Sequence, residues 1–445
     1  MLEQLRERLD EPTSRGLAHA VSAAISDGAL GDGDRLPPIR TVATSLQLSP
    51  TTVSAAWSLL VRAGTIRTDG RRGTTVAQRR TAGPGRYRRA LERPASFPVD
   101  LSTGVPDPQL LPDLSPSLHR LRGTTEPGSY LDHPVVPALE QALRSGWPYP
   151  PERMTIVDGA MDALDQISSV LLRFGDKVAV ENPCFPPLLD LLDACGVGMI
   201  GVDVDAEGLS PDGLDRALAD GARMVFLQPR AQNPTGASMT PGRAQRLSTL
   251  VGQAGAIAVE DDSAGGVASS PAISLGRWLP ERTLHVRSFS KSHGPDLRLA
   301  AVSGPADLVD PIVERRYLGQ GWTSRLLQTI LLDLLTSPRA VQQVDRARQA
   351  YADRRTAVVD ELRRHGIDSP SGDGLNLWLP VQDEAAALVR LASRGIGAAA
   401  GSPFAVTTGK QAHLRVTVGL VRSDYEQIAG ELAEAARVGG WTGPR

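Results

Sequence analysis

The segment 288–298 carries a lysine whose surroundings could support covalent chemistry. The chain has only three lysines, Lys177, Lys291 and Lys410, and arginine supplies nearly all of its other positive charge. An amine that must lose its proton and attack a carbonyl has to be a lysine, because arginine stays charged. Lys291 follows an apolar run, residues 283–286, and is flanked by serines. These features make it a candidate Schiff-base nucleophile; the alternative is a surface lysine in a polar turn.

Groups that could hold a phosphate lie close to this lysine in the sequence. Ser288 and Ser290 precede it and Arg298 follows it, so hydroxyl donors and a planar guanidinium fork share one short segment. The segment therefore indicates a phosphate site beside a candidate nucleophile.

The bulk composition bounds the class of protein. A chain of 445 residues is long enough for two or three domains, and 41% hydrophobic with 22% charged residues is ordinary for a soluble globular protein. No apolar run approaches the roughly 20 residues that span a bilayer, and residues 1–8 lack a signal-peptide core, so we expect a cytoplasmic protein with no membrane partner. Cys184 and Cys195 have neither a disulfide pattern nor metal-ligand spacing, so no metal site is predicted.

The formal net charge of −2 conceals an uneven distribution along the chain. Residues 1–95 hold 15 arginines and nine acidic residues, whereas the remainder holds 33 basic and 41 acidic residues. Such a split favours a nucleic-acid-facing N-terminal part and a separate body. A solvated arginine-rich surface would produce the same excess, so the charge needs a motif beside it.

The N-terminal part has the pattern of a winged helix-turn-helix. Apolar spacing and turn residues predict helices over 14–27, 39–46 and 51–63, followed by extended segments over 65–68 and 74–76. Ser49 is the expected N-cap of the third helix, and Pro50 is its first helical residue. In this fold the second helix of the pair enters the major groove with its N-terminal end.

Several polar side chains of this part are suited to contact double-stranded operator DNA. The candidates are the short donors around the start of the third helix and the arginines beside it and in the wing: Ser49, Thr51, Thr52, Ser54, Arg40, Arg71 and Arg72.

These residues carry a family resemblance. Segments 33–40, 48–53 and 70–74 resemble the GntR-type winged helix family, and the match spans almost all of residues 1–78. Arginines are common in that family's recognition helix, yet Pro50 and Ser54 stand at two such positions, so base contacts are expected to be fewer or shifted. The alternative is a winged helix used only for protein contacts.

Residues 79–97 are expected to form a linker. The stretch has no hydrophobic periodicity and combines glycine and proline with a cluster of arginines, which is typical of a flexible connection. Its charge would add non-specific attraction to phosphates, or serve solubility alone.

From Leu101 onward, short apolar runs alternate with helical patterns, as in an α/β fold with a mainly parallel sheet. Buried strands are predicted over 177–180, 224–227, 257–259 and 283–286. Because ligands gather at the carboxyl ends of such strands, the polar residues that follow each strand are the informative ones.

The polar segments of this body suit one cofactor. A small-residue turn that opens a helix at 157–164 offers backbone N–H groups for a phosphate, and Phe185 offers a flat ring for stacking. Residues 228–236 contain Asn-Pro-Thr-Gly, and residues 260–263 contain a pair of aspartates. Together with Lys291, these parts fit pyridoxal 5′-phosphate.

The set resembles the fold-type I, class I/II aminotransferases. The resemblance implies an aminotransferase-like domain over 98–445, with a large part over about 145–310 and a smaller α+β part over about 311–445. It implies that Lys291 forms the Schiff base, Asp261 meets the pyridine nitrogen, Asn233 bonds the phenolic oxygen and Phe185 stacks on the ring.

The same resemblance implies contacts at the two ends of the bound molecule. The phosphate would be held by Ala160, Met161, Ser288 and Arg298, with Tyr130 as the match to a tyrosine that reaches it from the partner subunit. Arg415, within a strand-like run, would bind a substrate or effector carboxylate. In the family a tyrosine follows the acid at position 261; here Ser263 offers only a weak substitute, which places efficient transamination in question.

A GntR-type winged helix joined by a basic linker to an aminotransferase-like domain resembles the MocR subfamily of bacterial regulators. That resemblance implies a homodimeric transcription factor that uses pyridoxal phosphate and senses a small amine, an amino acid or the cofactor itself. Three alternatives stay open: a working aminotransferase with an attached DNA-binding domain, a constitutive DNA-binding protein with a passive cofactor, and a degenerate domain without cofactor.

Overall fold

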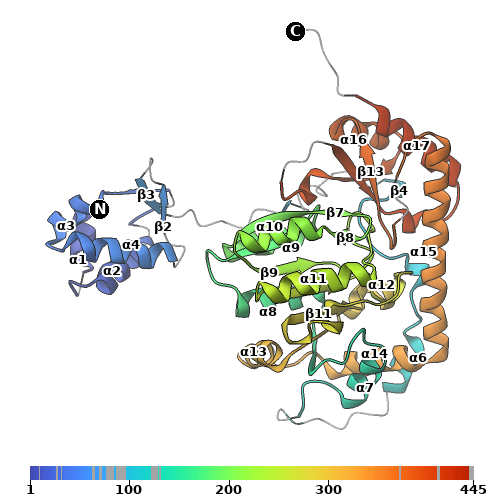
Figure 1. Cartoon of the computed structure of the whole chain (residues 1–445), viewed down its shortest axis with the longest axis horizontal. Helices are drawn as coiled ribbons and strands as arrows, with labels where there is room; N and C mark the ends of the chain where they lie inside the picture. Colours follow the sequence, from blue (N-terminus) through green and yellow to red (C-terminus); the bar gives the residue numbers. More distant parts are fainter. Residues whose placement is uncertain are drawn as a thin grey trace. The chain divides into compact units, whose positions relative to one another are not determined.

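The computed structural model describes residues 1–9, 11–26, 29–31, 33–62, 66–69, 73–76, 85–86, 97–121, 129, 132–369, 372–407 and 411–439. The chain divides into two compact units (Figure 1). The first comprises residues 1–84 with 173–175, and the second comprises residues 85–172 with 176–445.

The first unit packs helices against a small antiparallel sheet. Its described elements are α1 (Leu2–Glu7), α2 (Ser14–Ser26), β1 (Arg35–Leu36), α3 (Ile39–Leu46), α4 (Pro50–Arg62), β2 (Ile66–Asp69) and β3 (Gly73–Val76). The strands lie in the order β1-β3-β2. The predicted helix pair and hairpin are therefore confirmed, and α1 adds Leu5 to the same core.

The turn between α3 and α4 explains how the two helices are held. Gln47 follows α3 with a left-handed φ of 56°, which ends the helix. The Ser49 hydroxyl accepts a hydrogen bond from the backbone N–H of Thr52 at 3.0 Å and so caps α4. Val42 and Val53 are fully buried and Trp57 is 4% exposed, so both helices direct apolar side chains into one core.

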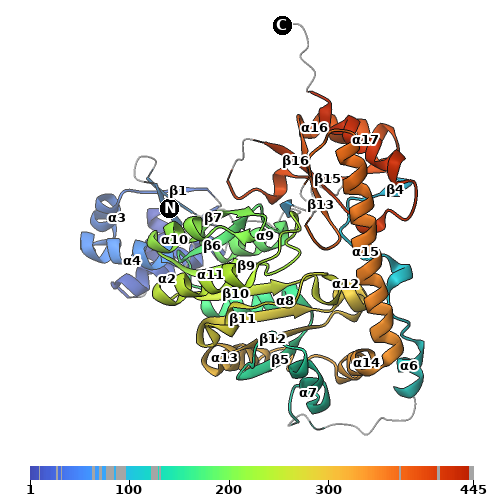
Figure 2. The same cartoon turned by 45° about the vertical axis from the view of Figure 1, so that its right-hand side comes forward.

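The second unit is built on an eight-stranded sheet (Figure 2). Its order is β5 (Arg153–Val157), β12 (Ala300–Gly304), β11 (Thr283–Ser288), β10 (Ile257–Asp262), β9 (Ala222–Leu227), β6 (Lys177–Asn182), β7 (Gly198–Asp205) and β8 (Gly208–Leu209). Strand β12 runs antiparallel to both neighbours and β8 runs antiparallel to β7, while the remaining pairs are parallel. The prediction of a mainly parallel sheet is confirmed.

Helices cover both faces of this sheet. One face packs against α8 (Ala160–Leu171), α9 (Pro186–Cys195) and α13 (Ala306–Tyr317), and the other packs against α10 (Pro211–Ala219) and α11 (Pro241–Gln253). Alternate strand residues serve the two layers: Val178 and Val180 face the first core, whereas Ala179 faces the second. Near β5 and β12, α7 (Pro137–Ser145) and α14 (Arg325–Thr336) enclose a third cluster, and α6 (Ser115–Leu121) packs beside α14.

A smaller antiparallel part follows the long helix α15 (Pro338–Arg364). It contains β13 (Leu377–Val381), α16 (Glu384–Ser393), β14 (Ile396–Gly397), β15 (Ala399–Ala400), β16 (Ala412–Val416) and α17 (Tyr425–Arg437). The order of its sheet is β13-β16-β15, which confirms the predicted α+β subdomain. No helix in the described parts of the chain is long and apolar enough to cross a membrane.

The first described residues after the connecting segment belong to this smaller part. Strand β4 (Val99–Asp100) pairs in parallel with β14. The Leu101 N–H donates to the Gly397 carbonyl at 2.9 Å, and the Leu101 carbonyl accepts from the Thr417 N–H at 2.8 Å. Backbone hydrogen bonds thus join residues from the beginning and the end of the aminotransferase-like domain.

All four predicted strands are longer than expected, and β9 begins two residues earlier, at Ala222. Strands β6, β10 and β11 continue to Asn182, Asp262 and Ser288, so several polar residues expected to follow strands lie inside them. Glu181 and Asp261 are buried there, because the backbone N–H and the side-chain amide of Gln228 supply hydrogen bonds that keep these polar residues in the interior.

Candidate functional site

Lys291 lies at the carboxyl edge of the large sheet, in the short helix α12 (Ser290–His293) that follows β11. Its Nζ atom lies 3.5 Å from the hydroxyl of Ser263, which follows the neighbouring strand β10. Burial lowers the pKa of the Lys291 ammonium; Asp261 opposes this effect and Arg415 adds to it. The lysine therefore loses its proton more readily than an exposed lysine does.

Asp261 is buried on β10 with one carboxylate oxygen occupied and one left over. Gln228 donates a side-chain N–H to Oδ2 at 2.8 Å, whereas Oδ1 has no hydrogen-bond partner among the described residues. Burial raises the pKa of Asp261 to about 6, although the hydrogen bond from Gln228 and the charge of Lys291 pull it down. A buried acceptor without a donor is costly, so Oδ1 marks a place for an N–H group from a bound molecule.

The start of α8 and Arg298 form a second polar corner. The helix begins at Ala160, so the first-turn N–H groups, including that of Met161, have no partner within the helix. Gly159 has a φ of 100°, and a Cβ atom there would lie 3.4 Å from the Arg298 guanidinium. Arg298 is itself left-handed at φ 48° and donates to the Asp158 carbonyl at 3.4 Å. These groups suit a phosphate.

Ser288 ends β11 and is buried. Its hydroxyl accepts a hydrogen bond from the Ser290 N–H at 3.3 Å. The hydroxyl hydrogen is not used in that bond, so Ser288 retains a donor for an anion.

Asn233 and Phe185 come from loops that follow β9 and β6. Asn233 is buried; its backbone N–H donates to the Gln228 side-chain oxygen at 2.6 Å, and its own oxygen accepts from Asn376 at 3.3 Å. Phe185 precedes α9 and lines the same small cavity as Asp261.

Arg415 lies on β16 and is 1% exposed. Its guanidinium donates to the Ser102 carbonyl and lies 5.6 Å from the centre of the Phe404 ring. A Cβ atom at Gly104 would come within 2.4 Å of the guanidinium, so the glycine permits this close approach. The charge of Arg415 acts on the pKa of Lys291, which places the two cations in one electrostatic neighbourhood.

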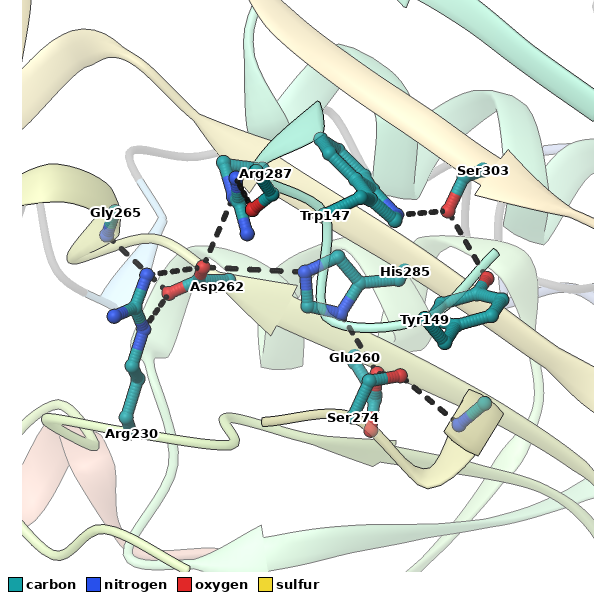
Figure 3. Close-up of polar contacts among 12 residues, drawn as sticks. Trp147, Tyr149, Arg230, Glu260, Asp262, Gly265, Ser274, His285, Arg287 and Ser303 are labelled. Atoms are coloured by element: carbon teal, nitrogen blue, oxygen red, sulfur yellow. Dashed lines mark hydrogen bonds and ion pairs between the residues drawn. The ribbon is translucent and has the colours of Figure 1, made fainter. Parts of the chain in front are cut away.

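A buried ionic network holds the opposite side of β10 (Figure 3). Arg230 donates two hydrogen bonds to Asp262, at 2.9 and 2.8 Å, and Arg287 lies 3.5 Å from the same carboxylate. His285 contacts Glu260 at 2.7 Å and lies 3.9 Å from Asp262. Burial opposes the charge of Asp262, but Arg230 and Arg287 outweigh it, so the pKa of that carboxyl lies below its usual value. The network fixes the strand that carries Asp261.

The described DNA-contact candidates lie around the first turn of α4. Ser49 not only caps the helix but also lies 2.7 Å from the hydroxyls of both Thr51 and Thr52. Thr51 and Ser54 are exposed on the helix, and Arg40 is exposed on α3. The hydroxyls of Ser49, Thr51 and Thr52 therefore all take part in the local turn, and Thr51, Ser54 and Arg40 are the candidates exposed on the two helices.

Several predicted residues lie outside the described part of the chain. These are the wing arginines Arg71 and Arg72, the partner-facing Tyr130, and all of the linker 79–97 except residues 85–86 and 97. Their predicted roles stay predictions.

Sequence reasoning missed Gln228, Arg230 and Arg316. Gln228 directly follows a predicted strand, which was a usable signal, but only the fold brings its amide to Asp261. Arg316 is 3% exposed and binds Asp158 and Asp162 beside the start of α8. No local pattern revealed it, because its partners lie more than 150 residues away.

A wide groove among the described residues does not coincide with the lysine. A groove of about 840 Å³ is lined by residues of β7, the Thr235–Ser238 loop, α15 and the pair Trp378 and His413. None of the cofactor residues predicted from the sequence lines it. Convergent polar chemistry, rather than volume, therefore identifies the site at Lys291.

The residues around Lys291 fit pyridoxal 5′-phosphate. Among the described residues, the buried Oδ1 of Asp261 has no hydrogen-bond donor, and a protonated ring nitrogen would supply one. Gly159 leaves space beside Arg298 where an anion can approach the start of α8. The predicted departure is Ser263, which occupies the sequence position of the family's tyrosine.

Family comparisons divide the chain in the same two regions. Residues 13–76 match the bacterial regulatory proteins of the gntR family, and residues 98–432 match aminotransferase class I and II.

Relatives with known names match nearly the whole chain. It is 35% identical over 440 residues to the vitamin B6 salvage pathway transcriptional repressor PtsJ of Salmonella typhimurium, covering 96% of this chain and 99% of that protein. It is 26% identical over 418 residues to the probable rhizopine catabolism regulatory protein MocR of Rhizobium meliloti, covering 85% and 81%.

Solved aminotransferases share the fold of the second unit. An archaeal alanine:glyoxylate aminotransferase matches with a TM-score of 0.70 at 20% identity, covering 79% of this chain and 93% of that one. The alpha-aminoadipate aminotransferase LysN of Thermus thermophilus matches with a TM-score of 0.69 at 21% identity, covering 85% and 98%. At such identity the likeness shows the fold alone.

Proposed function

Because this chain belongs to the MocR-type regulators, with a gntR-family helix-turn-helix followed by a class I and II aminotransferase domain, we propose that it controls transcription through pyridoxal 5′-phosphate. The cofactor binds at Lys291, and the regulator responds to a small amine, an amino acid or the cofactor itself. The coarser statement, a helix-turn-helix transcriptional regulator with an aminotransferase-like domain, is the premise of this proposal.

One observation carries the cofactor assignment. Lys291, with a lowered pKa, shares its site with Asp261, whose buried Oδ1 has no partner among the described residues. A lysine amine and an acceptor awaiting a positively charged N–H are the two groups that the cofactor's aldehyde and ring nitrogen require. A purely structural lysine would not need the second group.

When bound, pyridoxal 5′-phosphate supplies an aldehyde for amines and a ring that withdraws electrons while its nitrogen is protonated. In the proposal, Lys291 provides the amine and Asp261 holds the proton at the ring nitrogen. Arg298 and the first turn of α8 bind the phosphate. Arg415 binds the carboxylate of an amino acid effector by exchanging its hydrogen bond to Ser102 for one to the ligand.

The DNA-facing part of the proposal rests on α3 and α4. The N-terminal end of α4 enters the major groove of an operator, and exposed Thr51, Ser54 and Arg40 contact it. A homodimer would place two such helices on two half-sites. A regulator that binds chromosomal DNA works in the bacterial cytoplasm, and that location is part of the proposal. The PtsJ likeness supports a vitamin B6 compound as the first effector to test.

The cofactor assignment is tested by absorption spectroscopy of the purified protein. Wild type loaded with pyridoxal phosphate is expected to show a visible band that borohydride bleaches, leaving the cofactor attached to the peptide that contains Lys291. Lys291→Ala should lack the band. Lys177→Ala is the matched control. Lys177 donates to the Asp220 carbonyl and is not one of the predicted cofactor residues, so this variant should leave the band intact. Absence of a band in loaded wild type would overturn the cofactor assignment.

The regulatory part is tested by operator binding at fixed salt. DNA from the promoter region upstream of the gene is titrated with protein that is cofactor-free, cofactor-loaded, or cofactor-loaded in the presence of amino acids. A change in affinity with loading or with an amino acid supports the sensor. Equal affinity in all three states would overturn it and favour a constitutive DNA-binding protein.

A working aminotransferase with an attached DNA-binding domain is the alternative. Lys291 and Arg415 favour it, whereas Ser263 counts against it, because a serine hydroxyl is a weaker acid and a shorter donor than the family's phenol. Sustained conversion of amino acids to keto acids across a broad donor panel would support the enzyme. No turnover in that panel would reject it.

A further inference from the structure

We propose that Gln228 is a positioning residue that links three sides of the cofactor site through one side-chain amide. The inference rests on the proposed function, because it concerns how this chain prepares its residues for pyridoxal phosphate. Gln228 directly follows β9 and is 6% exposed. Strand β9 pairs in parallel with β10, so the residue that follows β9 lies beside Asp261 on β10.

The amide makes three hydrogen bonds to three residues of the site. Its nitrogen donates to Asp261 Oδ2 at 2.8 Å and to the Ser263 hydroxyl at 2.9 Å. Its oxygen accepts from the Asn233 backbone N–H at 2.6 Å. The residues assigned to the ring nitrogen, to the phenolic oxygen and to the neighbourhood of Lys291 are therefore tied to one group.

The orientation of the amide is determined by its partners. A backbone N–H only donates, so the oxygen of Gln228 must face Asn233. The two amide hydrogens then point at Asp261 and Ser263. The opposite orientation would place the amide N–H groups against the Asn233 N–H and the amide oxygen against the Asp261 carboxylate. Rotation is blocked as well, since the side chain is buried.

This arrangement directs the hydroxyl of Ser263. Because its oxygen accepts from Gln228, the hydroxyl hydrogen is left for another acceptor. Lys291 Nζ lies 3.5 Å away and accepts once it has lost its proton. Gln228 thus orients the group that stands in place of the family's tyrosine.

The arrangement also sets the charge of Asp261. The hydrogen bond to Oδ2 favours the ionised carboxylate and leaves Oδ1 free to hold a protonated ring nitrogen. The ionisable groups that shift the pKa of this carboxyl are Lys291, Asp262 and His285, and the carboxylate in turn raises the pKa of Glu181. Lys291 and His285 favour the ionised form of Asp261 while Asp262 opposes it, and none of these groups donates a hydrogen bond to Asp261.

Removing the amide therefore has a spectroscopic consequence. Without Gln228, Asp261 is protonated more easily and holds the positive ring nitrogen less well. A less positive ring repels the proton on the cofactor-linked lysine nitrogen less strongly, so that proton is lost at a higher pH. The pH midpoint of the visible band reports this change independently of any turnover.

The decisive comparison is Gln228→Met against Gln232→Met in cofactor-loaded full-length protein. Gln232 is 1% exposed on the same loop and bonds Glu181, the Pro183 carbonyl and Thr235 instead of the site residues. Both variants lose buried hydrogen bonds and should melt at lower temperature. Only Gln228→Met is expected to raise the pH midpoint of the visible band, by about 1 pH unit.

A second variant covers the case in which Gln228→Met does not fold. Gln228→Asn keeps an amide but is one methylene too short to reach all three partners, so it should raise the midpoint by a smaller amount. A wild-type midpoint in the Gln228 variants, or an equal rise in Gln232→Met, would overturn the positioning role while the visible band itself upholds the cofactor assignment. No band in wild type would overturn both.

Discussion

At the scale of single residues, the site sets two adjacent carboxylates to opposite tasks. Asp261 and Asp262 are neighbours on β10 and both are buried, yet the pKa of Asp261 is raised to about 6 whereas that of Asp262 is lowered. Burial acts on both in the same direction. The difference arises because Asp262 faces Arg230 and Arg287, while Asp261 has one amide donor and an unused oxygen. One carboxylate anchors the strand and the other awaits a ligand.

The anchoring role predicts a large loss of stability in Arg230→Met. Removing one partner of a buried ion pair leaves an uncompensated charge, so the free energy of unfolding should fall by about 3–5 kcal/mol. Urea unfolding of the full chain measures it. The control is Arg223→Met, because Arg223 forms an ion pair with Asp176 while its own side chain is 69% exposed, and the cost there should stay below about 1 kcal/mol. Equal losses in both variants would contradict the anchoring role.

Glu181 predicts how stability depends on pH. Burial raises its pKa from 4.5 to about 8, despite hydrogen bonds from Gln232 and the Gln228 N–H. The folded state therefore holds a proton that the unfolded state releases, so this stabilisation is complete below about pH 4.5 and is lost as the pH rises toward 8. The raised pKa of Asp261 stabilises the folded state in the same way, but this stabilisation is lost as the pH rises through about 6.

In cofactor-free protein, the free energy of unfolding should consequently decline between pH 6 and 8, by up to a few kcal/mol. Glu181→Gln should remove most of that decline, whatever its effect on absolute stability. Urea unfolding at several pH values compares the two slopes. Parallel slopes for wild type and variant in this window would show that Glu181 does not hold the proton.

Residue types predicted the candidates of the site better than its supports. Lys291 was identifiable because lysine is rare in this chain, and Asp261 because an acid followed a buried strand. Gln228 also followed a predicted strand, but residue type singled out neither Gln228 nor Arg230, since a glutamine or an arginine in a loop is usually solvated. Their importance depends on Asp261 and Asp262, which lie about 30 residues later and are brought close only by parallel pairing of β9 and β10.

At the scale of elements, the start of α8 determines how an anion is received. Gly159 precedes the helix with a φ of 100°, a conformation that side-chain-bearing residues rarely adopt. Its missing side chain keeps open the space beside Arg298. The turn therefore supplies both the helix N-terminus and the room for a ligand to approach it.

Gly159→Ala is accordingly expected to reduce cofactor retention on the order of tenfold, equivalent to about 1.4 kcal/mol. Gly221→Ala is the matched control: Gly221 has a φ of 93°, and a Cβ atom there would meet nothing within 4 Å. Both variants should lose about 1 kcal/mol of stability through backbone strain. Retention is measured by dialysis of loaded protein, and equal retention in the two variants would exclude a role of Gly159 in binding.

Element prediction succeeded where one physical signal dominated. The helix over 39–46 was predicted with its observed ends, because apolar spacing and flanking turns agreed. Strand β12 was missed, since Ala300–Gly304 consists of small residues whose burial comes from neighbours on both sides rather than from their own hydrophobicity. Strand β7 was missed because glycines and aspartates interrupt its apolar residues and most of them are only partly buried.

At the scale of the whole molecule, the N-terminal 95 residues and the rest of the chain carry different charge balances. The arginine excess lies within residues 1–95, whereas the aminotransferase-like body is acidic. A positively charged part favours phosphate backbones, and an acidic body discourages non-specific wrapping of DNA around the rest of the protein. The balance concentrates DNA attraction at the helix-turn-helix end.

Coupling between the two units predicts a reciprocal effect. If pyridoxal phosphate changes operator affinity by some factor, on the order of ten, then operator DNA must change cofactor affinity by the same factor. Both titrations are run at one salt concentration, because DNA affinity depends steeply on salt. In Lys291→Ala both factors should fall to one. Unequal factors in wild type would mean that a third component takes part.

The hydrogen bonds that attach residues 99–104 to the C-terminal part of the domain have a consequence for ligand binding. Strand β4 pairs with β14, and the Leu101 carbonyl accepts from the Thr417 N–H. The Gly104 N–H donates to the Thr417 hydroxyl at 2.9 Å. Between these contacts, the Ser102 carbonyl accepts a hydrogen bond from the Arg415 guanidinium. In the proposed function, an effector carboxylate that binds Arg415 competes with the Ser102 carbonyl for the guanidinium. Effector binding would therefore weaken the attachment of residues 99–104 to the C-terminal part of the domain.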